Sequence, residues 1–222
     1  MSNAAKLVGV FGGSFDPIHF GHIKPNLELI EECSLDHIRL VPCKVSPEKE
    51  RVYAATRHRW SMLSTVADNV AQFVADPIEI ERSTPSYSYE TLRMLRDSGC
   101  SKTRFAWILG MDAFLSFPQW YRASEILEIA HLIVLQRPGF FPPASGAAKV
   151  LMDKHGCRDV RELASSEAGS IYFAKTRLFD VSSTAIREMI RAGEPVKYLL
   201  PGSVWSYIQR NNLYSNEDLE KE

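Results

Sequence analysis

Short hydrophobic runs alternate along the chain with longer segments whose apolar positions recur every three or four residues. Runs of Val, Ile, Leu and Phe bounded by glycine or proline are typical of strands buried on both faces of a parallel sheet, and the second pattern is typical of amphipathic helices. The predicted strands cover residues 7–11, 37–42, 77–81, 105–109, 131–135 and 171–174. The strand at 77–81 is predicted from alternating apolar and polar residues. The predicted helices cover residues 19–34, 60–70, a stretch ending at 95, 124–130, 181–193 and 201–211.

The order of these elements predicts an α/β fold with a Rossmann-like, doubly wound parallel sheet. A chain of 222 residues with 45% hydrophobic content can bury one core. We therefore expect a single domain over residues 7–214, preceded by a disordered or vector-derived N-terminus over 1–6 and followed by an acidic tail over 215–222. The stretch 140–170 has the weakest pattern, and we expect one or two short helices within it.

The balance of charge limits the partners of the protein. Its 26 Lys and Arg residues against 27 Asp and Glu residues give a net charge of −1, so we expect binding to neither nucleic acid nor a membrane surface. No signal peptide and no membrane-spanning run is expected. Four widely spaced cysteines indicate reduced thiols and a cytoplasmic protein. These cysteines are Cys33, Cys43, Cys100 and Cys157.

The segment 7–22 holds the most informative pattern of the chain. A buried strand runs into the glycine pair 12–13, and a helix is expected to open around His19. Gly21 would let a phosphate group come close to the backbone, whose N–H groups at a helix start face an anion. His19 and His22 are three residues apart and so share one helix face. Two imidazoles, glycines and a helix N-terminus together predict a site for a polyanion.

Core packing and half of a zinc site are the other interpretations of the histidine pair. Zinc is disfavoured because no Cys-x-x-Cys pattern or third ligand is nearby in the sequence. Neither GxGxxG nor GxxxxGK[ST] occurs in the chain, so the glycines form neither a dehydrogenase fingerprint nor a P-loop. A nucleotide site of another kind is the prediction that remains.

These residues resemble the motifs of a known family. Residues 12–22, GGSFDPIHFGH, resemble the GxFDPxHxGH signature of the HxGH nucleotidyltransferases, which transfer a nucleoside monophosphate from ATP or CTP to a phosphorylated acceptor. A second stretch, 181–187 (VSSTAIR), resembles the ISSTxIR motif of that family, with Val181 in place of isoleucine. Alone it would indicate an ordinary helix N-cap. The resemblance implies that it closes over the phosphates of ATP from the far side.

Within that family, the resemblance to the nicotinate mononucleotide adenylyltransferases covers residues 7–214. Segments 85–88 (PSYS), 109–112 (LGMD) and 137–139 (RPG) resemble the PSYT, GxD and RPG segments of that subgroup. Trp120 resembles its ring-stacking tryptophan. The resemblance therefore extends from the phosphate motifs to the segments that hold the acceptor.

One departure from the subgroup falls in a charged loop. Ser-Pro-Glu-Lys at 46–49 replaces the usual PPHK, so the lysine is retained and Glu48 replaces the histidine. Structural interpretations also stay open for three matched residues. Trp120 could pack in the core, Asp112 could cap a helix, and Arg137 could be a surface charge.

The resemblance implies transfer of AMP from ATP, bound with Mg²⁺, to nicotinate mononucleotide, giving nicotinate adenine dinucleotide and pyrophosphate. It assigns catalysis to His19, His22 and Arg187, with no metal ligand from protein side chains. The ATP-binding residues that it implies are Gly12, Gly13, Ser14, Phe15, His19, Gly21, His22, Gly110, Asp112, Ser182, Ser183 and Arg187. The acceptor-binding residues that it implies are Lys49, Ser86, Tyr87, Ser88, Asp112, Trp120, Tyr121 and Arg137.

In the implied mechanism, His22 donates to the α-phosphate in the transition state and His19 places the triphosphate. Ser182 and Ser183 hold the β- and γ-phosphates. Trp120 stacks on the pyridine ring of the acceptor. The metal is held mainly by phosphates and water.

Two alternatives to this reaction are left open by the sequence. The resemblance implies that backbone groups near Tyr87 and Ser88 meet the carboxylate of the acceptor. The first alternative is a related transferase that acts on nicotinamide mononucleotide, pantetheine phosphate or glycerol phosphate instead. A nucleotide-binding regulator that has lost catalysis is the alternative from another class. A monomer and a homo-oligomer are both compatible with the sequence.

Overall fold

The computed structural model describes residues 6–44, 52–98 and 103–215. Within these ranges, seven strands form one parallel sheet in the order β3-β2-β1-β4-β5-β7-β6. The strands are β1 (Lys6–Gly13), β2 (His37–Pro42), β3 (Phe73–Ala75), β4 (Thr103–Gly110), β5 (His131–Leu135), β6 (Gly156–Cys157) and β7 (Ile171–Phe173). The helices are α1 (Phe20–Glu32), α2 (Thr56–Ala67), α3 (Ser88–Asp97), α4 (Met111–Ser116), the 3-10 turn η1 (Phe117–Gln119), α5 (Ala123–Ile129), α6 (Gly146–His155), α7 (Arg161–Ser165), α8 (Ser183–Arg191) and α9 (Gly202–Arg210).

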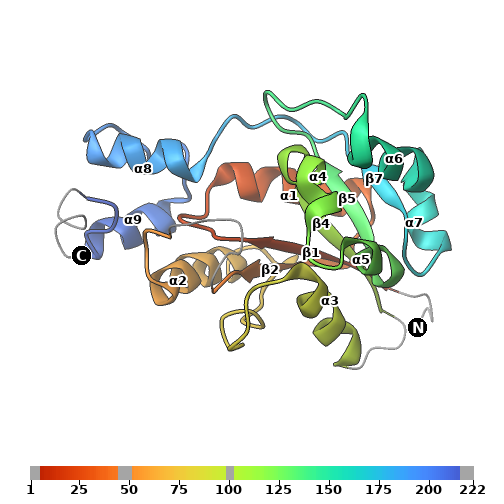
Figure 1. The fold of residues 1–222 in the computed structure, drawn as a ribbon. Coiled ribbons are helices and arrows are strands. Elements are labelled where there is room, and N and C mark those ends of the chain that lie inside the picture. The colour runs from red at the N-terminus through yellow and green to blue at the C-terminus, as the bar shows by residue number, and fades with distance from the viewer. Residues whose placement is uncertain (1–5, 45–51, 99–102, 216–222) are drawn as a thin grey trace.

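Successive residues of the central strands face opposite sides of the sheet, and helices cover both sides (Figure 1). In β4, Ala106 and Ile108 belong to the core shared with α1 and α2. The residues that alternate with them, Phe105, Trp107 and Leu109, belong to the core shared with α3, α4 and α5. Because both faces are buried, β4 is hydrophobic at every position from Phe105 to Leu109. The predicted doubly wound parallel sheet is confirmed.

The chain reverses its direction across the sheet between β1 and β4. It proceeds from β1 outward to β2 and β3, then crosses to the other side of β1 and continues through β4 and β5. In doubly wound sheets the crevice at such a point, beyond the carboxyl ends of the strands, is where ligands bind. Here the two carboxyl ends are Gly13 of β1 and Gly110 of β4.

The last two helices lie together at one end of the molecule, opposite the N-terminus (Figure 1). Ile186 of α8 and Val204 of α9 are fully buried in the core that also contains α1 and α2. The backbone N–H of Phe20 donates to the carbonyl oxygen of Leu199 at 3.0 Å. The segment between α8 and α9 is therefore hydrogen-bonded to the start of α1, next to the carboxyl end of β1.

The strand predicted at 77–81 is wrong. The edge strand is instead β3, at Phe73–Ala75, and the predicted segment is a turn. Oδ1 of Asp76 accepts from the backbone N–H of Ile78 at 3.0 Å, a side-chain bond that starts a turn where strand pairing would otherwise continue. Local hydrogen bonding by an Asp-Pro pair prevails here over the alternation of Ile and Glu.

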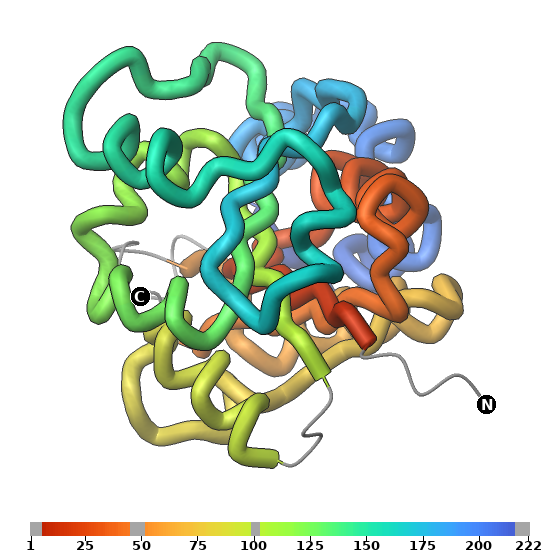
Figure 2. The backbone as a smooth tube through the Cα atoms, turned by 90° about the vertical axis from the view of Figure 1, so that its right-hand side faces the viewer, coloured from red at the N-terminus to blue at the C-terminus, as the bar shows by residue number. Residues whose placement is uncertain are grey.

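Two further predictions differ from the structure only in their boundaries. The helix predicted over 60–70 begins earlier and ends at Ala67, and Val70 lies in the turn that follows. The short helices expected within 140–170 are confirmed as α6 and α7, but the two-residue strand β6 was too short to predict. Before α6, the chain forms a wide loop on the outside of the molecule (Figure 2).

Two of the cysteines, Cys33 and Cys157, have thiols of low reactivity. Burial raises the pKa of the Cys33 thiol to about 12 and that of Cys157 to about 11, so both are protonated and weakly nucleophilic at neutral pH. Cys100 lies outside the described residues. The described residues also contain no helix of the length and apolarity needed to cross a bilayer.

Candidate active site

The first motif forms a turn between β1 and α1. Phe15 adopts a positive φ of 47°, and its buried ring meets the ring of His22 edge-on, with centroids 5.2 Å apart. Gly12 still belongs to β1, and a Cβ atom on it would stand 2.8 Å from the ring of Trp107. Gly12 is therefore required for packing of this indole in the core.

The two histidines of the first motif form a stacked pair at the start of α1. His19 is the N-cap and His22 the third residue of the helix, and their ring centroids lie 3.7 Å apart with the planes inclined by 23°. The backbone N–H of His19 donates to Nδ1 of His22 at 3.3 Å, which places the proton of a neutral His22 ring on Nε2. His19 is 2% exposed, whereas His22 is partly buried. His22 is thus the more accessible of the two to a ligand.

Gly21 lies where the two motifs touch. A Cβ atom on this residue would stand 3.0 Å from the ring of His19 and 3.0 Å from the carbonyl oxygen of Val181. On sequence grounds Gly21 makes room for a phosphate. In the structure it makes room for His19 and for the start of the second motif.

The second motif binds the first through side-chain hydrogen bonds. Oγ of Ser183 donates to the carbonyl oxygen of Pro17 at 3.0 Å, and Nη1 of Arg187 donates to that of Asp16 at 2.7 Å. Ser182 is the N-cap of α8, and its Oγ accepts a backbone hydrogen bond of the first turn at 3.1 Å. Residues about 165 positions apart thus form one site, with the Arg187 guanidinium 2.7 Å from the first turn.

Asp16 connects the first motif to two other parts of the chain. Its carboxylate accepts from the backbone N–H groups of Tyr53 at 2.7 Å and Ala54 at 3.1 Å, and from the hydroxyl of Tyr214 at 2.8 Å. Asp16 and Tyr214 are each 2% exposed. Burial, followed by the charge and the hydrogen bond of Asp16, raises the pKa of Tyr214 well above its usual value. The neutral phenol therefore acts as a donor to a buried carboxylate.

Arg59 supports the turn from beneath and was not predicted from the sequence. It is 1% exposed, and its Nη1 donates to the carbonyl oxygen of Ser14 at 2.8 Å. Its Nε donates to the carbonyl oxygen of Ala54 at 3.1 Å. The only sequence feature that could have indicated this role is the position of an arginine within the apolar stripe of α2. A charged side chain at such a position is buried only when it is well paired.

A second group of predicted residues lies at the carboxyl end of β4. Nε of Arg137 and Oδ1 of Asp112 are 3.5 Å apart, and both side chains are about 38% exposed. A Cβ atom on Gly110 would lie only 2.4 Å from that carboxylate oxygen and 3.2 Å from the Arg137 side chain. The glycine at the end of β4 therefore leaves room for this ion pair, which joins two of the segments that resemble the subgroup.

Three of the predicted acceptor-binding residues are aromatic and lie after η1 and at the start of α3. The ring of Trp120 packs on Phe117 with centroids 5.5 Å apart, and its Nε1 donates to Oγ of Ser116 at 3.4 Å. It is partly buried, so part of the indole is accessible. Tyr87 and Tyr121 lie ring on ring with centroids 4.6 Å apart, and Tyr121 is 48% exposed. The first turn of α3 and the segment after η1 therefore form one aromatic surface.

The remaining acceptor-side predictions fall around the start of α3. Ser88 is the first residue of the helix, and Ser86, just before the N-cap, is 8% exposed. Oγ of Ser86 accepts from the backbone N–H of Lys44 at 3.2 Å. Glu48 and Lys49 lie outside the described residues, so the role of their loop stays a prediction.

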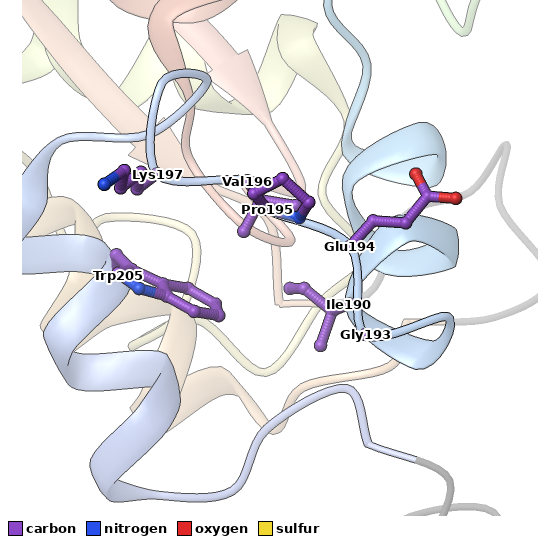
Figure 3. Close-up of a pocket in the computed structure, with 7 residues that line it drawn as sticks. All are labelled: Ile190, Gly193, Glu194, Pro195, Val196, Lys197 and Trp205. Atoms are coloured by element: carbon purple, nitrogen blue, oxygen red, sulfur yellow. The ribbon is translucent and has the colours of Figure 1, made fainter.

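A cavity of about 370 Å³ lies elsewhere, between the end of α8 and α9 (Figure 3). Figure 3 shows the indole of Trp205 facing Ile190 and Pro195 across it. Its lining residues are Ile190, Gly193, Glu194, Pro195, Val196, Lys197 and Trp205. It shares no residue with the predicted site, which is formed instead at the carboxyl ends of β1 and β4.

The fold and the two groups of residues define a nucleotide-binding α/β protein of the nucleotidyltransferase type. The chain belongs to the cytidylyltransferase-like family, whose model matches residues 10–189. The family resemblance seen in the two motifs is thereby confirmed. Within the described residues, no group of three His, Cys, Asp or Glu side chains is placed to hold a metal ion.

Curated relatives match nearly the full chain. A protein of Klebsiella pneumoniae named "Probable nicotinate-nucleotide adenylyltransferase" is 36% identical over 215 residues, which cover 96% of this chain and 100% of the relative. A Cellvibrio japonicus protein of the same name is 36% identical over 208 residues, covering 93% of this chain and 98% of its own.

Solved structures share the fold. Nicotinic acid mononucleotide adenylyltransferase of Plasmodium falciparum complexed with APC superposes with a TM-score of 0.69 at 18% identity, covering 94% of this chain and 97% of that one. The same enzyme complexed with NaAD gives a TM-score of 0.68, also at 18% identity and with the same coverage. At this identity the likeness concerns the fold alone.

Proposed function

We propose that this protein transfers AMP from ATP to nicotinate mononucleotide, producing nicotinate adenine dinucleotide and pyrophosphate. The observation that carries the proposal is that Ser183 and Arg187 of α8 are hydrogen-bonded to the turn at Asp16 and Pro17, which leads directly into the stacked histidine pair at the start of α1. Two helix N-termini and a guanidinium around one glycine-containing turn suit a triphosphate. The names of relatives 36% identical over nearly the whole chain support the same reaction.

The reaction needs alignment and charge stabilisation more than a protein nucleophile. An oxygen of the acceptor's 5′-phosphate forms a bond to the α-phosphorus of ATP, the bond from that phosphorus to the β-phosphate oxygen breaks, and pyrophosphate leaves with the electron pair. His22 carries its proton on Nε2, because Nδ1 accepts a backbone hydrogen, and this N–H donates to the α-phosphate as its charge grows. His19, buried beneath it, fixes the orientation of the ring.

The second motif holds the leaving phosphates in this proposal. Ser182 and Ser183 begin α8, whose first N–H groups, together with the hydroxyl of Ser182, would face the β- and γ-phosphates. Arg187 is held by Asp16 and by Oγ1 of Thr184 at 3.2 Å, so its positive charge is oriented before substrate binds. Pre-orientation reduces the reorganisation that the transition state requires.

The proposed substrates also indicate how the metal ion is held and in which compartment the enzyme acts. ATP enters with Mg²⁺, which prefers phosphate and water oxygens and needs few protein ligands. We propose that it is held in this way, without a dedicated protein cage. Because ATP is the proposed substrate and Cys33 and Cys157 are protonated thiols, we place the enzyme in the cytoplasm.

The acceptor occupies the second group of residues. The partly accessible indole of Trp120 stacks on the pyridine ring, and the N–H groups at the start of α3, near Tyr87 and Ser88, meet its carboxylate. In this proposal Asp112 accepts from a ribose hydroxyl, and its ion pair with Arg137 orients that carboxylate. Tyr121 and Ser86 support this surface through Tyr87 and the helix start. Lys49 is proposed to approach the acceptor phosphate.

A panel of acceptors tests the reaction. Pyrophosphate release from ATP and Mg²⁺ is measured with nicotinate mononucleotide, nicotinamide mononucleotide, pantetheine phosphate and glycerol phosphate. We expect the highest kcat/KM with nicotinate mononucleotide. Equal or faster turnover of another acceptor would overturn the substrate assignment, and no turnover of any acceptor would indicate a nucleotide-binding protein without transferase activity.

The variant His22→Ala tests the mechanism. Loss of one preorganised donor to a developing anion lowers kcat by roughly 10²–10³-fold. His37→Ala, at the opposite end of the parallel sheet where β2 begins, is the control and should retain wild-type turnover. Urea unfolding checks that both variants are folded. A His22→Ala protein with near-normal turnover would exclude the proposed role of this imidazole.

A further inference from the structure

A buried carboxyl group lies under the start of α3. Glu79 is in the turn between β3 and α3 and is only 3% exposed. Its Oε1 accepts from the hydroxyl of Thr91 at 2.6 Å, and it also accepts a hydrogen bond from the side chain of Ser86. A buried carboxyl is costly unless hydrogen bonds compensate it, so this group is built into the structure by specific partners.

The hydrogen bonds of Glu79 continue to the end of β2. Ser86 gives its hydroxyl hydrogen to Glu79, and its oxygen accepts the backbone N–H of Lys44 at 3.2 Å. Both capacities of the hydroxyl are thus used, and its direction is set by the carboxyl group. Ser86 directly precedes Tyr87, the N-cap of α3. Glu79 therefore links the end of β2 to the position of the first helical turn of α3.

Charged side chains lie close to Glu79 and to the start of α3. Burial raises the pKa of Glu79, opposed by the hydrogen bonds from Thr91 and Ser86 and by the charge of Arg82. Nη2 of Arg82 donates to the carbonyl oxygen of Pro85 at 2.9 Å, which holds this cation beside the same turn. The neighbouring carboxylate of Asp76 is paired with Arg39 at 2.6 Å. The cation of Arg82 therefore offsets the charge of Glu79 beside the start of α3.

We propose that Glu79 is a positioning residue for the acceptor, holding Ser86 and the first turn of α3 in the geometry that receives the carboxylate of nicotinate mononucleotide. It rests on the proposed function, because the start of α3 meets the acceptor only in that assignment. Since a carboxylate gains more from correctly aligned helix N–H groups than an amide does, this positioning sets the preference for nicotinate over nicotinamide mononucleotide.

The variant Glu79→Gln tests this role. The amide has nearly the same volume, but its NH₂ group cannot accept the hydroxyl hydrogen of Ser86 or Thr91. We expect the KM for nicotinate mononucleotide to rise about tenfold, as for the loss of about one hydrogen bond, and the ratio of kcat/KM values for the two mononucleotides to fall by a similar factor. The KM for ATP and kcat should stay within about twofold of the wild type.

The matched control is Glu81→Gln, the same chemical change at an exposed position two residues away. It should leave all of these parameters unchanged. Thr91→Val, which removes one hydroxyl donor to Glu79 at nearly constant volume, should shift the acceptor KM in the same direction. If Glu79→Gln does not fold, Thr91→Val tests the same positioning role.

Two results would overturn the inference. An unchanged acceptor KM and selectivity in folded Glu79→Gln would show that the residue is only structural. An equal rise in the KM values for ATP and acceptor would show general loosening of the site. Failure of the proposed function is distinguishable, because the wild-type protein would then fail to transfer AMP to nicotinate mononucleotide.

Discussion

The hydroxyl of Tyr214 offers a direct test of how the end of the chain stabilises the site. It donates to Oδ1 of Asp16 at 2.8 Å across a sequence separation of 198 residues. The substitution Tyr214→Phe removes this one donor and keeps the ring, which is 2% exposed and packs in the core with Ile208 and Leu213. The measured change therefore reports the hydrogen bond more than the packing.

The expected magnitude follows from the partners of Asp16. A hydrogen bond to a buried charged group contributes about 1.5–3 kcal/mol. Asp16 keeps two backbone donors, those of Tyr53 and Ala54, so the carboxylate is not left without partners in the variant. We therefore expect the free energy of unfolding to fall by about 2 kcal/mol, roughly a 30-fold change in the unfolding equilibrium constant.

Urea unfolding at pH 7, followed by circular dichroism, measures this loss. Tyr198→Phe is the control, because this side chain is 61% exposed and its hydroxyl is accessible to water. A second check combines Tyr214→Phe with Asp16→Asn. Removing the Tyr214 hydroxyl should lower the free energy of unfolding clearly less in Asp16→Asn than in the wild type, because the charged acceptor is absent there.

Two outcomes would refute this reasoning about Tyr214. The first is a loss in Tyr214→Phe of less than about 0.5 kcal/mol, the range of an ordinary surface substitution. The second is an equal loss with and without the Asp16 carboxylate. Either would mean that the hydroxyl does not stabilise the fold through Asp16.

Gly21→Ala should lower kcat roughly tenfold or more, because the new methyl group would crowd His19 and Val181 at 3.0 Å, and should change the free energy of unfolding little, because alanine favours the helix. Gly202→Ala, which has open space around its Cβ, is the control. Equal kcat values in the two variants would contradict the argument. His131 accepts from the Ser170 N–H at 3.2 Å through Nδ1, and burial lowers its pKa. The unfolded state therefore binds the proton first, so stability is complete above about pH 6.5 and decreases by up to about 1.4 kcal/mol per unit as pH falls toward the lower folded pKa. His131→Asn should reduce this slope in unfolding measured from pH 7 to 5, and an unchanged slope would exclude His131 as its source.

The sequence predicted the central strands well and the sheet edge poorly. A strand buried on both faces, such as 105–109, must be hydrophobic at every position, and its pattern is therefore visible in a single sequence. At 77–81 the same reasoning failed, because the alternation of Ile and Glu comes from a turn started by Asp76 and from the burial of Glu79. An edge strand of three residues, Phe73–Ala75, has too few positions to show any period.

The candidate site was predicted where its residues are close in sequence. His19 and His22 share a helix start, and their spacing alone places both rings on one face. Arg59 could not be assigned, since the Ser14 carbonyl oxygen that it binds belongs to a turn 45 residues away and carries no sequence signature. Asp16 was visible within its motif, but its three donors were not.

The amino-acid sequence alone determined the class of fold and the two motifs that resemble those of the nucleotidyltransferases, because periodicity, glycine turns and helix starts are local properties of the chain. Only the tertiary structure decided that Arg187 and Ser183 hold the turn of the first motif, that Tyr214 caps Asp16, and that Glu79 is buried beneath α3. These contacts join residues between 12 and 198 positions apart. A hydrogen bond of this kind depends on where the folded backbone brings its two ends, and that is a property of the whole packed chain.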